Sequence, residues 1–165
     1  MPIGKPLTPG RRPEVFEFRG INFAPNVCFE STVTHLLSRH LRELSERQQE
    51  PDALVNVTND GWFFGSNCLD LHLACNVFRS VEFRKPTLIA ANTGFSGHIN
   101  SLGQRLDVGP RRETDILIID FDKEARLTSQ YRAVGEYPAI ICLCIATLAL
   151  IWGVAADRLG KRSQS

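Results

Sequence analysis

The residues best suited to chemistry lie at one point of the chain, where a predicted strand turns into a predicted helix. Cys28 stands at this junction and is followed by Phe29 and Glu30. A thiol at the start of a helix lies beside unpaired backbone N–H groups and the positive end of the helix dipole, which favour the nucleophilic thiolate. The sequence therefore makes Cys28 a candidate nucleophile. The alternative is a small buried thiol at the end of a core strand, where free cysteines are common.

The segments around Cys28 predict a strand, helix, strand unit. Segments 15–18 and 21–27 predict two strands joined as a hairpin, and the second strand ends at Cys28. The short apolar segment 53–57 predicts a strand buried on both faces and parallel to segment 21–27. The helix expected between these strands has an apolar stripe made of Val33, Leu36, Leu37, Leu41 and Leu44.

Parallel pairing predicts where the next loop lies. The carboxyl ends of parallel strands meet at one edge of the sheet, so Cys28 and the loop 58–65 should lie at the same edge, where α/β proteins keep their sites. Three consecutive aromatic residues, 62–64, occupy this loop. They either line a pocket for an apolar substrate or pack beneath the loop as a cap on the core. Ser31 or Thr32 is expected to cap the intervening helix.

A second helix is predicted over residues 69–84. Cys68, His72 and Cys75 fall at spacings of four and three, which places them on one helical face and resembles part of a metal site. Structural zinc needs four ligands, and no fourth is evident nearby. We therefore predict no metal and no cofactor, and interpret His72 as a hydrogen-bonded histidine beside the edge of the sheet that carries the site.

The remaining segments complete a predicted α/β body. A buried strand is expected over residues 86–91, a hairpin over 98–100 and 104–106, and a last strand over 115–121. The formal net charge of +1 provides no basic surplus for a nucleic-acid backbone. Five cysteines, an odd number, suggest no disulfide framework.

The C-terminal part contains a run of twenty residues without a charge. Residues 137–156 are long enough for a helix that crosses a bilayer, with Tyr137 and Trp152 near its ends, where interfacial aromatic residues belong. The alternative is a buried core helix. A polar, basic tail is expected over 157–165. The Pro- and Gly-rich residues 1–14 predict an N-terminal loop, with neither a signal peptide nor a membrane anchor.

Several spaced motifs together resemble one family. These are Cys-Phe-Glu at 28–30, Asn-Asp-Gly-Trp-Phe at 59–63, the segment from His72 to Glu82, Asn-Thr-Gly-Phe-Ser at 92–96, and the terminal apolar helix. In this order they resemble the C-terminal part of apolipoprotein N-acyltransferase, a membrane-embedded branch of the nitrilase, or carbon–nitrogen hydrolase, superfamily. The resemblance covers roughly residues 10 to 160. It implies that residues 15–132 form the second half of an αββα sandwich.

The resemblance implies an activity and a set of site residues. Family members transfer an acyl chain from a phospholipid to the N-terminal amine of a diacylglyceryl-cysteine lipoprotein, through a thioester on a Glu–Lys–Cys triad. Cys28 matches the nucleophile, Glu30 a supporting carboxylate, and the backbone N–H of Phe29 an oxyanion donor. The expected location is the bacterial inner membrane, with the catalytic part on the periplasmic side. The residues expected at the substrate are Asn59, Trp62, Phe63 and His72.

Two features depart from the family pattern. Phe29 stands where the family usually has tyrosine, and no residue here matches the triad glutamate or lysine. Lys5 is a poor substitute, because the family's lysine lies on a strand well before this position. We therefore expect a part of an acyltransferase that is inactive alone, with a separately encoded N-terminal half as a possible partner. The alternatives are a fragment of a soluble amidase and a non-catalytic, membrane-anchored partner.

Overall fold

The computed structural model describes residues 8, 10–123, 125 and 127–162. It divides into two units, residues 1–129 and 130–165, and each is described by itself. Residues 1–7 and 9 of the predicted N-terminal loop, Lys5 among them, lie outside the described residues. The same holds for residues 163–165 of the predicted basic tail.

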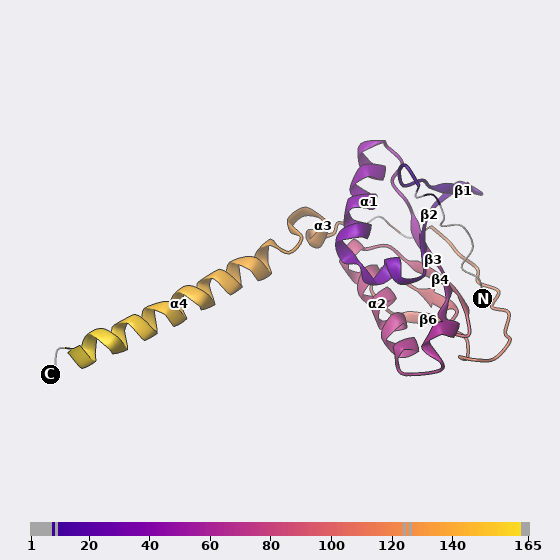
Figure 1. Ribbon diagram of the computed structural model, residues 1–165. Coiled ribbons are helices and arrows are strands. Elements are labelled where there is room, and N and C mark those ends of the chain that lie inside the picture. The colour runs from indigo at the N-terminus through magenta and orange to yellow at the C-terminus, as the bar shows by residue number, and fades with distance from the viewer. Residues whose placement is uncertain (1–7, 9, 124, 126, 163–165) are drawn as a thin grey trace. The chain divides into compact units, whose positions relative to one another are not determined.

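The first unit is built on one mixed sheet of six strands in the order β1-β2-β3-β4-β5-β6 (Figure 1). The central pairs, β2 with β3 and β3 with β4, are parallel, while the outer pairs are antiparallel. The predicted parallel pairing of the strand before Cys28 is thus confirmed. The strands are β1 (Phe16–Phe18), β2 (Ile21–Val27), β3 (Ala53–Asn59), β4 (Thr87–Asn92), β5 (Gly97–Ile99) and β6 (Arg105–Val108).

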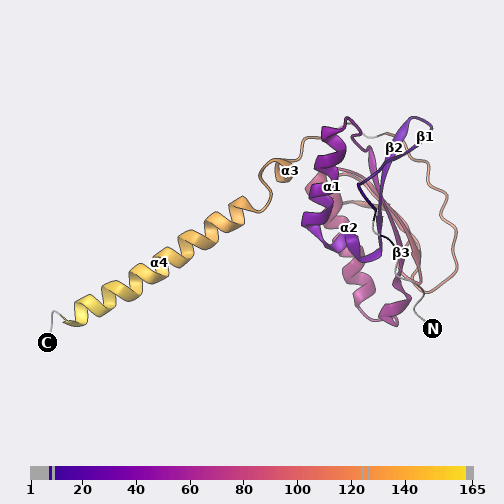
Figure 2. The ribbon, with the colours of Figure 1, turned by 45° about the horizontal axis from the view of Figure 1, so that its top comes forward.

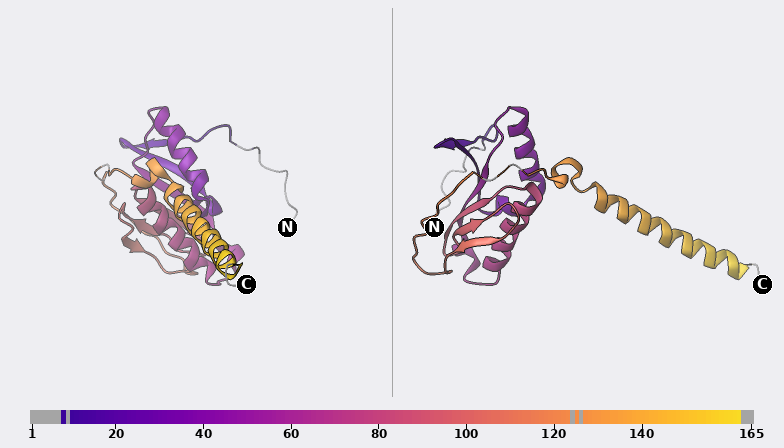
Figure 3. Two further views of the ribbon diagram at one scale, coloured as in Figure 1. Left: turned by 90° about the vertical axis from the view of Figure 1, so that its left-hand side faces the viewer. Right: turned by 180° about the vertical axis from the view of Figure 1, so that it is seen from behind.

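Two α-helices cover one face of this sheet (Figures 2 and 3). Helix α1 (Thr34–Glu46) connects β2 to β3, and α2 (Cys68–Phe83) connects β3 to β4. Each follows a short 3-10 helix, η1 (Cys28–Thr32) before α1 and η2 (Asp60–Phe63) before α2. The two parallel crossovers place both helices on the same side, as right-handed connections require.

The core lies between this helical layer and the sheet. Alternate strand residues face the helices and are buried, while their neighbours on the opposite face are more exposed. The sheet therefore has one face that the helices cover and one that they do not. The buried apolar residues are Ala24, Ala53, Leu54, Ile89 and Ile99 from the strands, Leu37, Leu41 and Leu44 from α1, and Leu69, Leu73 and Phe83 from α2.

Arg79 links the two helices. Its guanidinium group donates to the Thr34 hydroxyl at the start of α1 and forms an ion pair with Glu82, one turn along α2, at 3.0 Å. The Arg79 side chain is buried, and a buried cation requires such partners. Arg79 and Glu82, two polar residues of the segment from His72 to Glu82, therefore have a structural role.

The start of α1 differs from the prediction. Neither Ser31 nor Thr32 caps this helix, because both lie within η1 and the cap position is Val33, whose side chain makes no capping bond. Instead, their hydroxyls donate to backbone oxygens three residues earlier, at Cys28 and Phe29. Hydroxyl side chains often form such local bonds to the backbone, so a serine or threonine does not by itself mark the start of a helix.

The predicted strand over residues 115–121 is wrong, because this segment forms no strand. It crosses the sheet face opposite the helices (Figure 2). Phe121 packs against Phe23 of β2 and His98 of β5, with ring centroids 5.7 and 5.6 Å apart. Lys123 forms an ion pair with buried Asp52 at 2.8 Å. A run of apolar residues is compatible with a strand, but a strand also needs a partner strand that hydrogen-bonds to it.

The second unit consists of a short helix, α3 (Gln130–Val134), and a long one, α4 (Tyr137–Arg162). The predicted helical run over 137–156 is confirmed. Within it, Tyr137–Val154 are long and apolar enough to cross a membrane by length and composition. The side chains of this stretch are exposed within the unit, unlike those of a soluble core helix.

Candidate active site

Cys28 occupies the junction between β2 and η1 in a strained conformation. Its φ is +52°, in the left-handed region that costs a residue with a Cβ about 1–2 kcal/mol. Its side chain is half-buried. The junction lies at the carboxyl edge of the parallel strands, beside the end of β3. Backbone strain of this kind clusters at active sites, and in this chain it also occurs in ordinary turns, as at Arg19 and Gln48.

Phe29 follows Cys28 and supplies the next backbone N–H. As a residue in the first turn of a helix, it has no intrahelical acceptor for that group. Its side chain is exposed. A backbone N–H without an intrahelical acceptor therefore follows directly after the thiol in the chain.

The backbone oxygen of Cys28 is enclosed by polar side chains. Asn56 Nδ2 donates to it over 3.1 Å, the Ser31 hydroxyl donates over 3.3 Å, and His72 Nε2 lies 3.2 Å away. Asn56 Nδ2 also donates to Asn26 Oδ1 at 2.5 Å, which joins the ends of β2 and β3. The turn at Cys28 is thus tied to β3 and α2 as well as to its own helix.

His72 also contacts two buried side chains. Its Nδ1 is 3.0 Å from Asp60 Oδ1, and its Nε2 is 2.9 Å from Ser31 Oγ. Asp60 Oδ1 accepts a second hydrogen bond, from the Thr58 hydroxyl at 2.6 Å. Gly94 closes the other side, because a Cβ at this position would lie 2.0 Å from Asp60 Oδ2. His72, predicted to contact substrate, is buried and bonded within this group.

The carboxylate of Glu30 turns back along the chain. It accepts a hydrogen bond from the backbone N–H of Val27 at 2.7 Å, as the third residue of a capping box does. It therefore braces the turn that carries Cys28. Beside it on α1, burial lowers the pKa of His40, and the negative charge of Glu30 opposes that shift.

Of the three aromatic residues in the loop, one is partly buried and two are exposed. Phe63 is half-buried and stands edge-on to the His72 ring, with centroids 6.1 Å apart. Trp62 and Phe64 are 75% and 89% exposed. Asn59 Oδ1 accepts from the Gly61 N–H at 3.3 Å and from the Asn92 side chain, so it fixes the loop. The loop thus presents apolar surface near the Cys28 edge.

Cys68, His72 and Cys75 of α2 do not form a metal site in the structure. Cys68 is exposed and Cys75 half-buried, while His72 faces Asp60 and Ser31. Within the part of the chain that the structure describes, no group of three or more His, Cys, Asp or Glu residues is placed to hold a metal ion.

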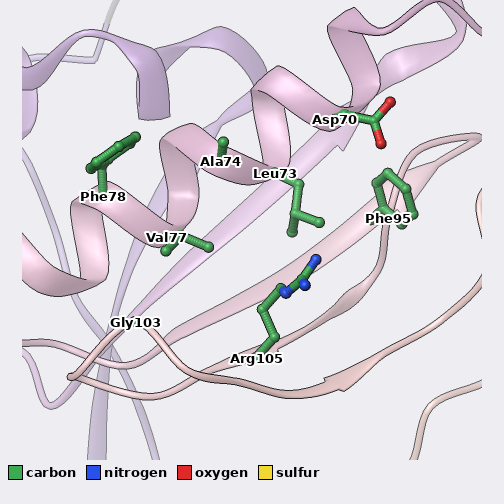
Figure 4. Close-up of a pocket in the computed structure, with 8 residues that line it drawn as sticks. All are labelled: Asp70, Leu73, Ala74, Val77, Phe78, Phe95, Gly103 and Arg105. Atoms are coloured by element: carbon green, nitrogen blue, oxygen red, sulfur yellow. The ribbon is translucent and has the colours of Figure 1, made fainter.

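A separate pocket of about 350 Å³ lies between α2 and the β5–β6 hairpin (Figure 4). Asp70, at its rim, forms an ion pair with Arg111 at 2.7 Å. None of the predicted site residues lines this pocket, and it contains no nucleophile. Its lining residues are Asp70, Leu73, Ala74, Val77, Phe78, Phe95, Gly103 and Arg105.

Comparison with known proteins finds relatives in sequence. An apolipoprotein N-acyltransferase of Rhodopirellula baltica is 33% identical over the whole chain, and one of Chlamydia pneumoniae is 31% identical over 95% of it. The chain is a sequence relative of the apolipoprotein N-acyltransferases. It spans 29% of the length of each of these two proteins. No protein-family model matches the chain.

A solved structure shows the fold of this N-acyltransferase relative. A carbon–nitrogen hydrolase superfamily protein of Xanthomonas campestris, solved with an arsenic adduct in its active site, superposes with a TM-score of 0.51 at 20% identity. The superposition covers 65% of this chain and 43% of the other. The mixed sheet with helices on one face is therefore a carbon–nitrogen hydrolase fold, as the sequence predicted.

Proposed function

We propose that the chain is the nucleophile-bearing part of an apolipoprotein N-acyltransferase, with Cys28 as the acyl carrier. The observation that carries this proposal is the position of Cys28, at the carboxyl edge of parallel strands, in a strained turn followed by a free backbone donor. The relatives in Rhodopirellula and Chlamydia support the acyl-transfer chemistry.

The proposed reaction has two steps. The Cys28 thiolate attacks the ester carbonyl of a phospholipid, and the tetrahedral oxyanion accepts from the Phe29 N–H. Its collapse breaks the C–O bond, leaves the acyl group as a thioester and releases a lysophospholipid, whose alkoxide takes a proton. The amine of a diacylglyceryl-cysteine lipoprotein then attacks the thioester. An amide forms, the C–S bond breaks, and the thiol is regenerated after the amine loses a proton.

The remaining predicted site residues have supporting roles in this proposal. Glu30 holds the Cys28 turn through the Val27 N–H. Trp62 and Phe63 give the neighbouring loop an apolar surface of the kind that an acyl chain contacts. A glutamate base and a lysine complete the family's triad, and we propose that they come from another part of the enzyme, such as a separately encoded N-terminal half.

A labelling experiment tests the proposed thioester. The chain is placed in a complete enzyme, in which it replaces the matching segment of the Rhodopirellula relative, and is incubated with phospholipid. An acyl group that hydroxylamine removes should appear on the peptide that contains Cys28. Cys68 and Cys75 serve as internal controls by mass spectrometry. Acylation of either one in place of Cys28 contradicts the proposal.

We also propose that residues 137–156 span the bacterial inner membrane, with the catalytic part on the periplasmic side. The support is the uncharged run of α4, which is the length that a bilayer needs. When membranes from cells that express the chain are washed with alkaline carbonate, the chain should stay in the pellet. A matched chain that ends at residue 129 should leave the pellet. Release of the full chain into the supernatant would contradict the membrane span.

A further inference from the structure

A group of polar side chains lies beneath Cys28 in the layer between sheet and helices. Asn56 and Ser31 are 0% exposed, and Asp60, His72 and Asn26 are nearly as buried. Such groups are costly in an apolar layer unless they bond to one another. Here they form one connected network, from Thr58 through Asp60, His72 and Ser31 to the Cys28 oxygen, which Asn56 also reaches.

Part of this network has the distances of a hydrolytic Ser-His-Asp triad. His72 lies 2.9 Å from the Ser31 hydroxyl and 3.0 Å from the Asp60 carboxylate. Ser31 cannot act as a nucleophile, however, because its side chain has no access to a substrate. Its hydroxyl also lies beside the Cys28 oxygen. The arrangement is therefore suited to hold a group in place and not to attack one.

The group it holds is the peptide bond between Cys28 and Phe29. This bond is trans and planar, so its C=O and its N–H point in opposite directions. Asn56, Ser31 and His72 come from β3, η1 and α2, and all three lie within 3.3 Å of the Cys28 oxygen. Fixing the oxygen toward the core therefore directs the Phe29 N–H away from it.

We propose that His72, with Ser31 and Asp60, is a positioning device that sets the Cys28–Phe29 peptide plane and so aims the Phe29 N–H at the reacting carbonyl oxygen. Asp60 orients the His72 ring, and Thr58 orients Asp60. The network also holds Cys28 in its left-handed conformation, since rotation of this plane would break the bonds to its oxygen. The consequence for catalysis rests on the proposed function, whereas the fixed peptide plane does not.

The chain offers a specific probe of this peptide bond. Cys28–Phe29 is the only Cys–Phe pair among the 165 residues. Labelling with carbonyl-¹³C cysteine and ¹⁵N phenylalanine therefore gives a single peak in an HNCO spectrum of the full chain in detergent micelles. The ¹³C shift reports hydrogen bonds at the Cys28 oxygen, and the amide shifts report the surroundings of the Phe29 N–H.

Replacement of His72 tests the proposal. In His72→Leu the carbonyl ¹³C resonance and the Phe29 amide shift should both move, because the ring that contacts the Ser31 hydroxyl and the Cys28 oxygen is lost. His72→Gln places a polar side-chain amide near the position of Nε2 and should restore most of the wild-type shift. The matched control is Ser80→Ala, which deletes a buried hydrogen bond from α2 to Thr87 and touches nothing at Cys28.

Two results overturn the proposal. One is an unmoved peak in folded His72→Leu protein, and the other is a shift of the same size in Ser80→Ala. If His72→Leu fails to fold, Ser31→Ala provides the decision, because it removes a single hydroxyl. Its ¹³C resonance should move to lower frequency, as for a carbonyl that loses a hydrogen bond, and an unmoved peak refutes the network's role.

A kinetic comparison separates this proposal from the proposed function. In the complete enzyme described above, His72→Leu should slow thioester formation by about 10²-fold with KM unchanged, as loss of one oxyanion donor does, and His72→Gln should recover most of the rate. Absence of any thioester on Cys28 in the unchanged enzyme defeats the proposed function, while a shifted HNCO peak would still support the fixed peptide plane. A normal rate in His72→Leu defeats the positioning role alone.

Discussion

Cys28→Ala is expected to abolish acyl transfer by a complete enzyme that carries this chain. The rate from phospholipid to a diacylglyceryl peptide should fall on the order of 10⁴-fold or more, because a nucleophile works as a unit with its base and oxyanion donor. Cys28→Ser should be nearly as damaging, since a hydroxyl is far less acidic than a thiol and less nucleophilic. The measurement is the initial rate of peptide acylation, followed by mass spectrometry.

The control for this prediction is another cysteine of the same chain. Cys68 is exposed at the start of α2, and the Cys28 turn belongs to another element, η1. Cys68→Ala should therefore leave the rate within about twofold, in line with the small effects of most surface substitutions. Residual activity of Cys28→Ala above a tenth of the unchanged rate would show that another group carries the acyl chain.

The order of the elements could be predicted from the sequence because each element of the crossover unit carries its own pattern. The stripe of leucines in α1 and the β-branched run of β3 are local signals, and parallel pairing follows from a helix between two strands. The segment 115–121 shows the limit of such signals. Its run of apolar residues, 116–119, resembles that of a buried strand, yet the segment forms no strand, because strand formation also depends on a pairing partner elsewhere in the chain. Ile118, on this segment, is 92% exposed.

The position of the candidate nucleophile, Cys28, could be predicted from the sequence, but the polar network beneath it could not. Cys28 stands out because of its position, whereas Ser31 resembles an ordinary helix cap and Asp60 an ordinary turn residue. A usable signal did exist in the strands. Asn26 and Asn56 are polar residues inside otherwise apolar strands, and a buried amide must have partners. These two positions could have indicated a polar network beneath the Cys28 edge before the structure was known.

The last expectation is that the 165-residue chain alone has no measurable N-acyltransferase activity. None of its residues is assigned as the triad base or lysine, and it spans 29% of the length of its Rhodopirellula relative. Without those partners no group takes the proton of the thiol during its attack, so the thiol reacts slowly. Loss of members of such a unit typically costs several orders of magnitude in rate.

The sheet face opposite the helices gives a second reason to expect inactivity of the isolated chain. Val27 and Val57 on that face are 61% and 52% exposed, next to the Cys28 edge. Apolar surface of this kind favours association, so the isolated chain should self-associate, as light scattering can show. Supplying the upstream part of a relative in trans should cover the face and restore turnover. The expectation fails if the purified chain, with no partner, transfers an acyl group from phospholipid at a rate that Cys28→Ala removes.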